Sequence, residues 1–194
     1  MIEKLISKNR SYRRFNYLQK ISPDLLLKFI DLARKAASGR NLQPLKYILS
    51  TEEKINNSIF SNLTWAGYLS DWSGPLEDER PSAFIIVLHD KQIKTSQELL
   101  WCDLGLACQN ILLGAVENKL GGCLLKAFHK KNIINLLKID ARYDPLLIIA
   151  LGQPKEKVVL TEAHNQKDIK YFRDEKDIHY VPKRKLTDLI LKNF

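Results

Sequence analysis

The chain has 194 residues, 45% of them hydrophobic, which is enough to bury one substantial core and predicts a single domain over residues 1–194. No early apolar run resembles a signal peptide and no uninterrupted apolar stretch is long enough to cross a bilayer, so a cytoplasmic protein without a membrane partner is expected. The three cysteines are odd in number and lack a C-x-x-C pair, which argues against a disulfide framework and a zinc site. The net charge of the chain is +9.

The first predicted helices carry recognisable start signals. Apolar residues indicate a short opening helix over 2–6. The tripeptide Ser-Pro-Asp at 22–24 predicts a second helix, because serine caps helices well and proline fits the first helical turn. That helix should end near Gly39, since glycine favours helix C-termini.

Strands and a further helix follow. The segment 46–50 (KYILS) is a strand candidate. Ser50 and Glu53 have the spacing of a capping box and predict a helix that extends to Phe60. The run 82–90 (SAFIIVLHD) is almost continuously apolar and rich in β-branched residues, which indicates a buried strand.

The longest predicted helix spans 95–118, and Thr95 begins a capping-box motif at its start. Apolar residues occupy more than one face of this helix. It must therefore be covered from several directions, either as the central helix of the domain or as part of a large subunit contact. A short strand over 121–128, a helix around 133–137 and a strand over 145–154 are predicted after it.

The last part of the chain has a different character. Residues 155–182 are polar and charged with little periodicity, which indicates either disorder or an arm that packs at a specific place. Scattered hydrophobic residues favour the arm: Tyr171, Phe172, Ile178, Tyr180 and Val181. A closing helix is predicted over 185–194. Together the elements predict alternating helices and strands, followed by a C-terminal arm and helix over 155–194.

Basic residues gather at the two ends of the chain. Residues 1–40 contain ten basic residues against three acidic ones, and residues 155–194 contain ten against seven. Phosphate groups attract such charge, so nucleic acid is the first partner to consider. However, the sequence has neither an aromatic ladder nor a helix-turn-helix pattern. A small phosphorylated ligand fits equally well, and an ordinary solvated basic surface is the third explanation.

Several familiar catalytic motifs do not occur in the sequence. It contains no G-x-G-x-x-G after a strand, no P-loop, no G-x-S-x-G and no H-E-x-x-H. The four histidines lie far apart without ligand spacing, so each is expected to be an ordinary histidine and no metal site is predicted. The acidic run 77–79 is interpreted as a solvated loop, and no catalytic acid or base is assigned.

Four segments together resemble the nitroreductase family of FMN-dependent oxidoreductases. They occur in the family's order and approximate spacing, and they span nearly the whole chain. They are NRSYRRF (9–15), SGRNLQPLKY (38–47), LGGCLL (120–125) and HYVPKR (179–184). The region from WAGYLSDW (65–72) to ERPSAFIIVL (79–88) is similar to one bacterial branch of that family.

The resemblance implies an FMN site built from separate segments. In similar proteins the first segment meets the FMN phosphate and ribityl chain, a late basic pair completes the phosphate grip, a second segment comes from the opposite subunit, and a third passes close to the isoalloxazine ring. The matching positions are, in that order, Arg10, Ser11 and Arg13; Lys183 and Arg184; Ser38, Gly39, Asn41 and Gln43; and Gly121 and Gly122. Arg13 is the candidate for the cation near the N1/O2 side of the flavin.

Three aromatic residues fall in a region that caps the active site in similar proteins: Trp65, Tyr68 and Trp72. One interpretation is an aromatic wall that stacks planar substrates over the flavin. The other is a core cluster that anchors the loop. The sequence leaves both open.

The resemblance further implies an α+β fold, in which helices surround a central mixed or antiparallel sheet, and a homodimer with two FMN sites at its interface. NAD(P)H would reduce FMN and leave, and a small-molecule acceptor such as a nitroaromatic or a quinone would then take the electrons, in a ping-pong mechanism. Two alternatives remain: another flavin reaction on the same fold, such as dehydrogenation, dehalogenation or flavin remodelling, or a non-enzymatic module that binds phosphate or nucleic acid through its basic ends.

Overall fold

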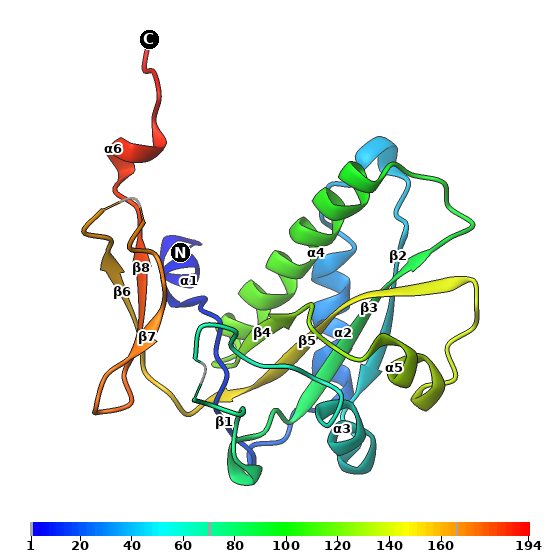
Figure 1. Cartoon of the computed structure of the whole chain (residues 1–194). Coiled ribbons are helices and arrows are strands. Elements are labelled where there is room, and N and C mark those ends of the chain that lie inside the picture. Colours follow the sequence, from blue (N-terminus) through cyan, green and yellow to red (C-terminus); the bar gives the residue numbers. More distant parts are fainter. Residues whose placement is uncertain (1, 70, 166) are drawn as a thin grey trace.

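A central antiparallel sheet forms the body of the molecule (Figure 1), seen in a computed structural model that describes residues 2–69, 71–165 and 167–194. Its strands are β1 (Phe15–Asn16), β2 (Leu45–Ser50), β3 (Ala83–Asp90), β4 (Gly121–Leu125) and β5 (Tyr143–Pro154). The central strand is β5, which pairs with β1, β3 and β4, and β2 pairs with the other edge of β3. The expected α+β class is confirmed.

Helices cover both faces of this sheet. On one face pack α2 (Pro23–Ala33) and the long α4 (Gln97–Glu117). On the other face lie α3 (Glu53–Phe60) and α5 (Lys130–Leu136), together with the loop that follows α3. The body is therefore a three-layered arrangement with the sheet in the middle.

The side chains of β3 alternate between the two sides of the sheet. Ile85 and Val87 join the cluster under α2 and α4, whereas Phe84, Ile86 and Leu88 join the cluster under α3 and α5. Because both faces are covered, both sets of alternating positions are apolar. This explains the continuous apolar run and confirms the predicted buried strand.

The predicted helix boundaries are partly correct. Ser22 caps α2 as predicted, since its Oγ accepts a hydrogen bond from the Leu25 amide at 3.2 Å. The helix nevertheless ends at Ala33 rather than near Gly39. The reason is local: residues 39–41 form a separate 3-10 turn with left-handed backbone, which cannot continue an α-helix.

Both predicted capping boxes are wrong. Ser50 does not cap α3, because its hydroxyl donates to Asn56 Oδ1 at 2.7 Å inside the body. At the start of α4 the cap is Ser96, one residue after Thr95, and its Oγ accepts from the Leu99 amide at 3.3 Å. Two neighbouring hydroxyl residues offer the same local chemistry, so sequence alone could not choose between them.

The elements after α4 differ from their predicted ranges at one or both ends: β4 ends at Leu125, α5 begins at Lys130, and β5 contains the predicted strand 145–154 but begins at Tyr143. In the part of the chain that the structure describes, α4 alone has the length and composition of a possible membrane-spanning helix. Half of that helix is buried in the body, against α2 and the sheet.

The arm contains a small sheet of its own. Its strands are β6 (Val158–Glu162), β7 (Phe172–Arg173) and β8 (His179–Lys183), with β8 in the middle, parallel to β6 and antiparallel to β7. Figure 1 shows this sheet beside the body, with the C-terminal residues extending away from it. Sequence analysis predicted an arm but no strands in it.

The closing helix is much shorter than predicted. α6 covers only Leu186–Leu189, not residues 185–194. No residue of α6 is buried. Helices this short draw their stability from packing an apolar face, and the two leucines of α6, Leu186 and Leu189, stay largely exposed in the part of the chain that the structure describes.

Candidate cofactor site

A cavity of about 330 Å³ lies between the start of the chain and the arm. Its described lining includes three cations and no carboxylate. The lining residues are Asn9, Arg10, Ser11, Arg13, Gln109, Leu112, Leu124, Tyr171, His179, Val181 and Lys183. The two basic ends of the sequence thus meet in space, and the cavity has the charge to attract an anion. We refer to it as the anion cavity.

Arg13 is held firmly in this cavity by residues of the arm. Only 8% of Arg13 is exposed, and its guanidinium lies 4.7 Å from the ring centre of Tyr171. Its Nη1 is 3.3 Å from Nε2 of His179 and 3.4 Å from the backbone oxygen of Ser11. A guanidinium can only donate, so His179 accepts through Nε2.

His179 must be neutral to accept that bond. Its side chain is completely buried. Burial is the main cause that lowers the pKa of His179, and together with the nearby charges of Arg13 and Arg173 it brings this pKa to about 4. At neutral pH the imidazole therefore carries no charge that would repel Arg13. His179 is thus a buried histidine whose Nε2 accepts a hydrogen bond, while its Nδ1 has no partner among the described residues.

The other predicted phosphate contacts are placed unequally. Arg10 donates through Nη2 to the backbone oxygen of Ile6 at the end of α1 (Ile2–Lys8), while its Nε is buried without a partner among the described residues. Ser11 and Lys183 both reach the anion cavity with exposed side chains. Arg184 follows Lys183 immediately but does not line the cavity.

The predicted glycine segment lies against the arginine segment. The Tyr12 amide donates to the backbone oxygen of Gly122 at 3.0 Å. A Cβ at Gly121 would lie 2.3 Å from the Tyr12 ring, and a Cβ at Gly122 would lie 2.7 Å from the backbone oxygen of Ala150. Packing inside the chain alone therefore requires both glycines. Their place beside the flavin stays a prediction.

The predicted second flavin segment lies at a different cavity of the same chain. Ser38 and Gln43 line a cavity of about 170 Å³, which also involves Asp103 of α4. The carboxylate of Asp103 accepts from Ser38 Oγ at 2.6 Å and from the Gly39 amide at 2.8 Å. Within one chain this segment does not join the lining of the anion cavity.

This segment also stores backbone strain. Three residues of the segment that are not glycine have a positive φ: Arg40 at 55°, Asn41 at 55° and Gln43 at 52°. Such conformations cost energy and persist only where surrounding contacts hold them. Here the contacts are Asp103 and Ser38, whose Oγ accepts from the Gln43 amide at 3.0 Å.

Glu156, where the arm begins, fixes the arginine segment. Its side chain is fully buried, and one carboxylate oxygen accepts from the backbone amides of Arg13 and Arg14, the latter at 3.1 Å. The other oxygen accepts from Arg173 Nη2 at 2.9 Å. Body and arm are thus joined through one buried carboxylate next to the anion cavity.

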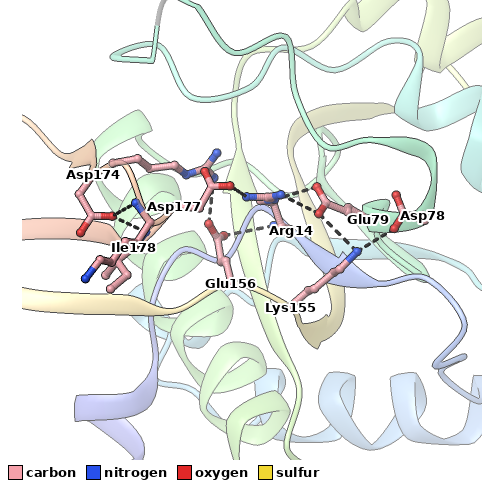
Figure 2. A network of polar contacts seen from close by, with 10 residues as sticks. Arg14, Asp78, Glu79, Lys155, Glu156, Asp174, Asp177 and Ile178 are labelled. Atoms are coloured by element: carbon pink, nitrogen blue, oxygen red, sulfur yellow. Dashed lines mark hydrogen bonds and ion pairs between the residues drawn. The ribbon is translucent and has the colours of Figure 1, made fainter.

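Arg14 has a structural role, as Figure 2 shows. Its guanidinium donates to both carboxylate oxygens of Glu79, at 2.7 and 2.8 Å, and lies 3.0 Å from Asp177 of the arm. Lys155 bridges Glu79 and Asp78 nearby, at 3.4 and 2.7 Å. Glu79 is 3% exposed, so the expectation of a wholly solvated acidic run at 77–79 is wrong.

The three aromatic candidates separate into different environments. Trp65 is buried and packs on Phe60 with ring centres 5.8 Å apart, which favours the core interpretation for it. Tyr68 is exposed and lies 5.0 Å from Tyr171, a lining residue of the anion cavity. The ring of Trp72 lies 4.4 Å below the Arg173 guanidinium. A contact with substrate stays a prediction for all three, and Tyr68 is the best placed.

No sequence pattern marks the residues that hold these groups in place. Asp103 and Glu156 carry no motif, and their role depends on partners far away in sequence. Tyr171 had a usable signal, since it was recognised as a hydrophobic residue that anchors the arm. His179 belongs to the HYVPKR segment, but burial, which gives it its role, is not visible in a sequence.

Comparison with known proteins places the chain. The family model described as "Nitroreductase family" matches residues 6–153. The chain belongs to the nitroreductase family. This confirms the resemblance. The match to the family ends where the arm begins, so Glu156, Tyr171, His179 and Lys183 lie outside it.

Solved structures agree on the nitroreductase fold. A nitroreductase family protein from Streptococcus pneumoniae TIGR4 has a TM-score of 0.69 at 17% identity, covering 87% of this chain and 98% of that one. One from Clostridium novyi NT has a TM-score of 0.66 at 22% identity, covering 97% and 98%. An FMN-dependent nitroreductase from Clostridium difficile R20291 has a TM-score of 0.62 at 21% identity, covering 87% and 94%.

Proposed function

We propose that the protein is an FMN-dependent oxidoreductase that transfers two electrons from NAD(P)H to a nitroaromatic, a quinone or a similar acceptor by a ping-pong mechanism. Family membership supports the class of enzyme. FMN is named for the C. difficile relative. The observation that carries the proposal for this chain is the convergence of Arg10, Arg13 and Lys183 on a cavity whose described lining has no carboxylate.

The residues of the anion cavity fit the anionic tail of FMN. Arg10 and Lys183 would bind the phosphate, since guanidinium and ammonium groups make strong charge-assisted hydrogen bonds to phosphate oxygens. The buried Nε of Arg10, which has no partner among the described residues, would gain an acceptor. The Ser11 hydroxyl would serve the ribityl alcohols.

Bound FMN supplies the redox chemistry, by accepting a hydride from NAD(P)H and passing two electrons to the acceptor. Arg13 would place a positive charge where the reduced ring becomes negative. Tyr171 and neutral His179 keep its guanidinium in one position, so little reorganisation is required when charge develops. No side-chain acid or base is assigned.

A homodimer is part of the proposal. The strained segment with Ser38 and Gln43 lies at a separate cavity, so a second copy would be needed to bring it to the anion cavity. The surface offers apolar contacts for that copy: Leu106 of α4 is 44% exposed, and the C-terminal tail exposes five more large hydrophobic side chains. These are Leu186, Leu189, Ile190, Leu191 and Phe194.

The test begins with the absorbance spectrum and the mass of the purified protein. We expect a yellow dimer with about one FMN per chain that NADH or NADPH bleaches without oxygen and that menadione or nitrofurazone reoxidises. A Lys183→Gln variant should bind FMN about tenfold more weakly, because it loses one charge-assisted contact. Lys28→Gln, which changes an exposed lysine of α2, is the matched control.

Two outcomes would contradict the proposal. A colourless protein that takes up no FMN and binds RNA in a salt-dependent manner would support a nucleic-acid module instead. A yellow protein that NAD(P)H reduces but that no nitro compound or quinone reoxidises would place the chain among enzymes of another flavin reaction.

A further inference from the structure

A second cavity, of about 380 Å³, opens near the start of α4. Its lining combines aromatic and apolar side chains with two lysines and one aspartate. The lining residues are Gln97, Leu100, Trp101, Lys126, Phe128, Lys130, Asp144, Pro145 and Leu146. None of these residues is part of the anion cavity.

Lining residues of the two cavities follow one another at the end of β4, which ends at Leu125. Leu124 is exposed and lines the anion cavity, Leu125 is buried, and Lys126 is exposed and lines the second cavity. In extended chain, alternate residues lie on the same side and about 7 Å apart. A ligand that extends from the anion cavity past Leu124 therefore arrives next to Lys126.

The second cavity has one positive charge that no carboxylate among the described residues compensates. Lys130 is neutralised by Asp144, with Nζ and Oδ1 2.7 Å apart. Lys126 has no carboxylate partner in the part of the chain that the structure describes, and its Nζ instead lies 4.3 Å from the ring centre of Trp101. The contact with Trp101 orients the ammonium without removing its charge.

We propose that this cavity selects planar aromatic acceptors that carry an anionic substituent such as a carboxylate. Lys126 would bind the carboxylate, and Trp101 with Phe128 would flank the aromatic ring. The proposal rests on the proposed function, because it assigns the substrate class to the same active site. It concerns binding and adds no chemical step.

The test compares two acceptors that differ in charge, 4-nitrobenzoate and its neutral methyl ester. The measured quantity is the ratio of their kcat/KM values with holoenzyme. In Lys126→Gln this ratio should fall about fivefold, the value of one ion pair near the protein surface. Lys131→Gln, on the exposed side of α5, should keep the wild-type ratio. FMN content and melting temperature verify that both variants are folded.

An unchanged ratio in Lys126→Gln would overturn the proposal. So would a variant whose preference for NADPH over NADH changes while the acceptor ratio stays constant, because the cavity would then belong to the dinucleotide. If neither of these acceptors turns over and menadione and nitrofurazone fail as well, the proposed function fails separately. Equilibrium dialysis of 4-nitrobenzoate then measures binding directly, and equal affinity for wild type and Lys126→Gln overturns the inference.

Discussion

Glu156 offers the most direct test of how the arm supports the site, and Glu156→Gln is the smallest change that removes its charge. The amide oxygen of glutamine can still accept from the backbone amides of Arg13 and Arg14. The variant therefore mainly loses the interaction of the second carboxylate oxygen, which accepts a hydrogen bond from Arg173 at 2.9 Å. There the glutamine NH₂ would face the guanidinium, donor against donor.

The magnitude follows from burial. The Glu156 side chain is fully buried and that of Arg173 is 10% exposed, so water replaces little of the lost interaction. Removing one partner of such a pair leaves a buried charge, and we expect the free energy of unfolding to fall by about 3 kcal/mol. We also expect weaker FMN retention, since the arm supplies Tyr171 and His179 to the anion cavity.

The assay is urea unfolding followed by tryptophan fluorescence, with the slope m compared between variants. Glu175→Gln, on the exposed surface of the arm, is the matched control and should change the free energy by less than about 0.5 kcal/mol. If Glu156→Gln is as mild as that control, the carboxylate does not join arm to body and the reasoning fails.

Two further predictions concern the body. The Arg142 guanidinium lowers the pKa of Asp90 to about 2, so this ion pair stabilises the fold above about pH 4, and its contribution is lost as the pH falls towards 2. In the Asp90→Asn variant, the melting temperature should therefore depend less on pH between pH 4 and pH 2. The same pH dependence in variant and wild type would refute this role of the pair. Gly122→Ala should lower the free energy of unfolding in urea by about 2 kcal/mol, because the new Cβ would lie 2.7 Å from the Ala150 backbone oxygen. Gly67→Ala is the control, since no atom lies within 4 Å of its Cβ. Equal losses of free energy in the two variants would contradict the packing argument.

Local sequence patterns correctly predicted those elements whose structure depends on residues close together in the sequence. The strand β3 is apolar at consecutive positions, because both of its faces are buried. The cap at Ser22 needs only a neighbouring amide. In both cases the composition and spacing of neighbouring residues are enough to predict the element.

The arm sheet lacked such evidence. β7 has two residues, and β6 has no buried residue, so no alternating pattern develops. What holds the arm is tertiary: Glu156 meets Arg14 across 142 positions of sequence, and Arg14 meets Glu79 across 65. A single glutamate in a polar segment gives no sign of such partners, so sequence analysis could predict an arm but not its attachment.

Arg13 and Arg14 illustrate that residue type alone does not predict which side chain lines the anion cavity. The two are chemically identical neighbours, and either could have served a phosphate or a flavin. Consecutive residues of an extended chain point to opposite sides. Arg13 consequently enters the anion cavity, where the described lining has no carboxylate to neutralise it, whereas Arg14 turns towards Glu79 and Asp177 and is neutralised there. The direction of the backbone, fixed by the bonds of Tyr12 to Gly122 and of both arginine amides to Glu156, thus decides which positive charge is available to a ligand.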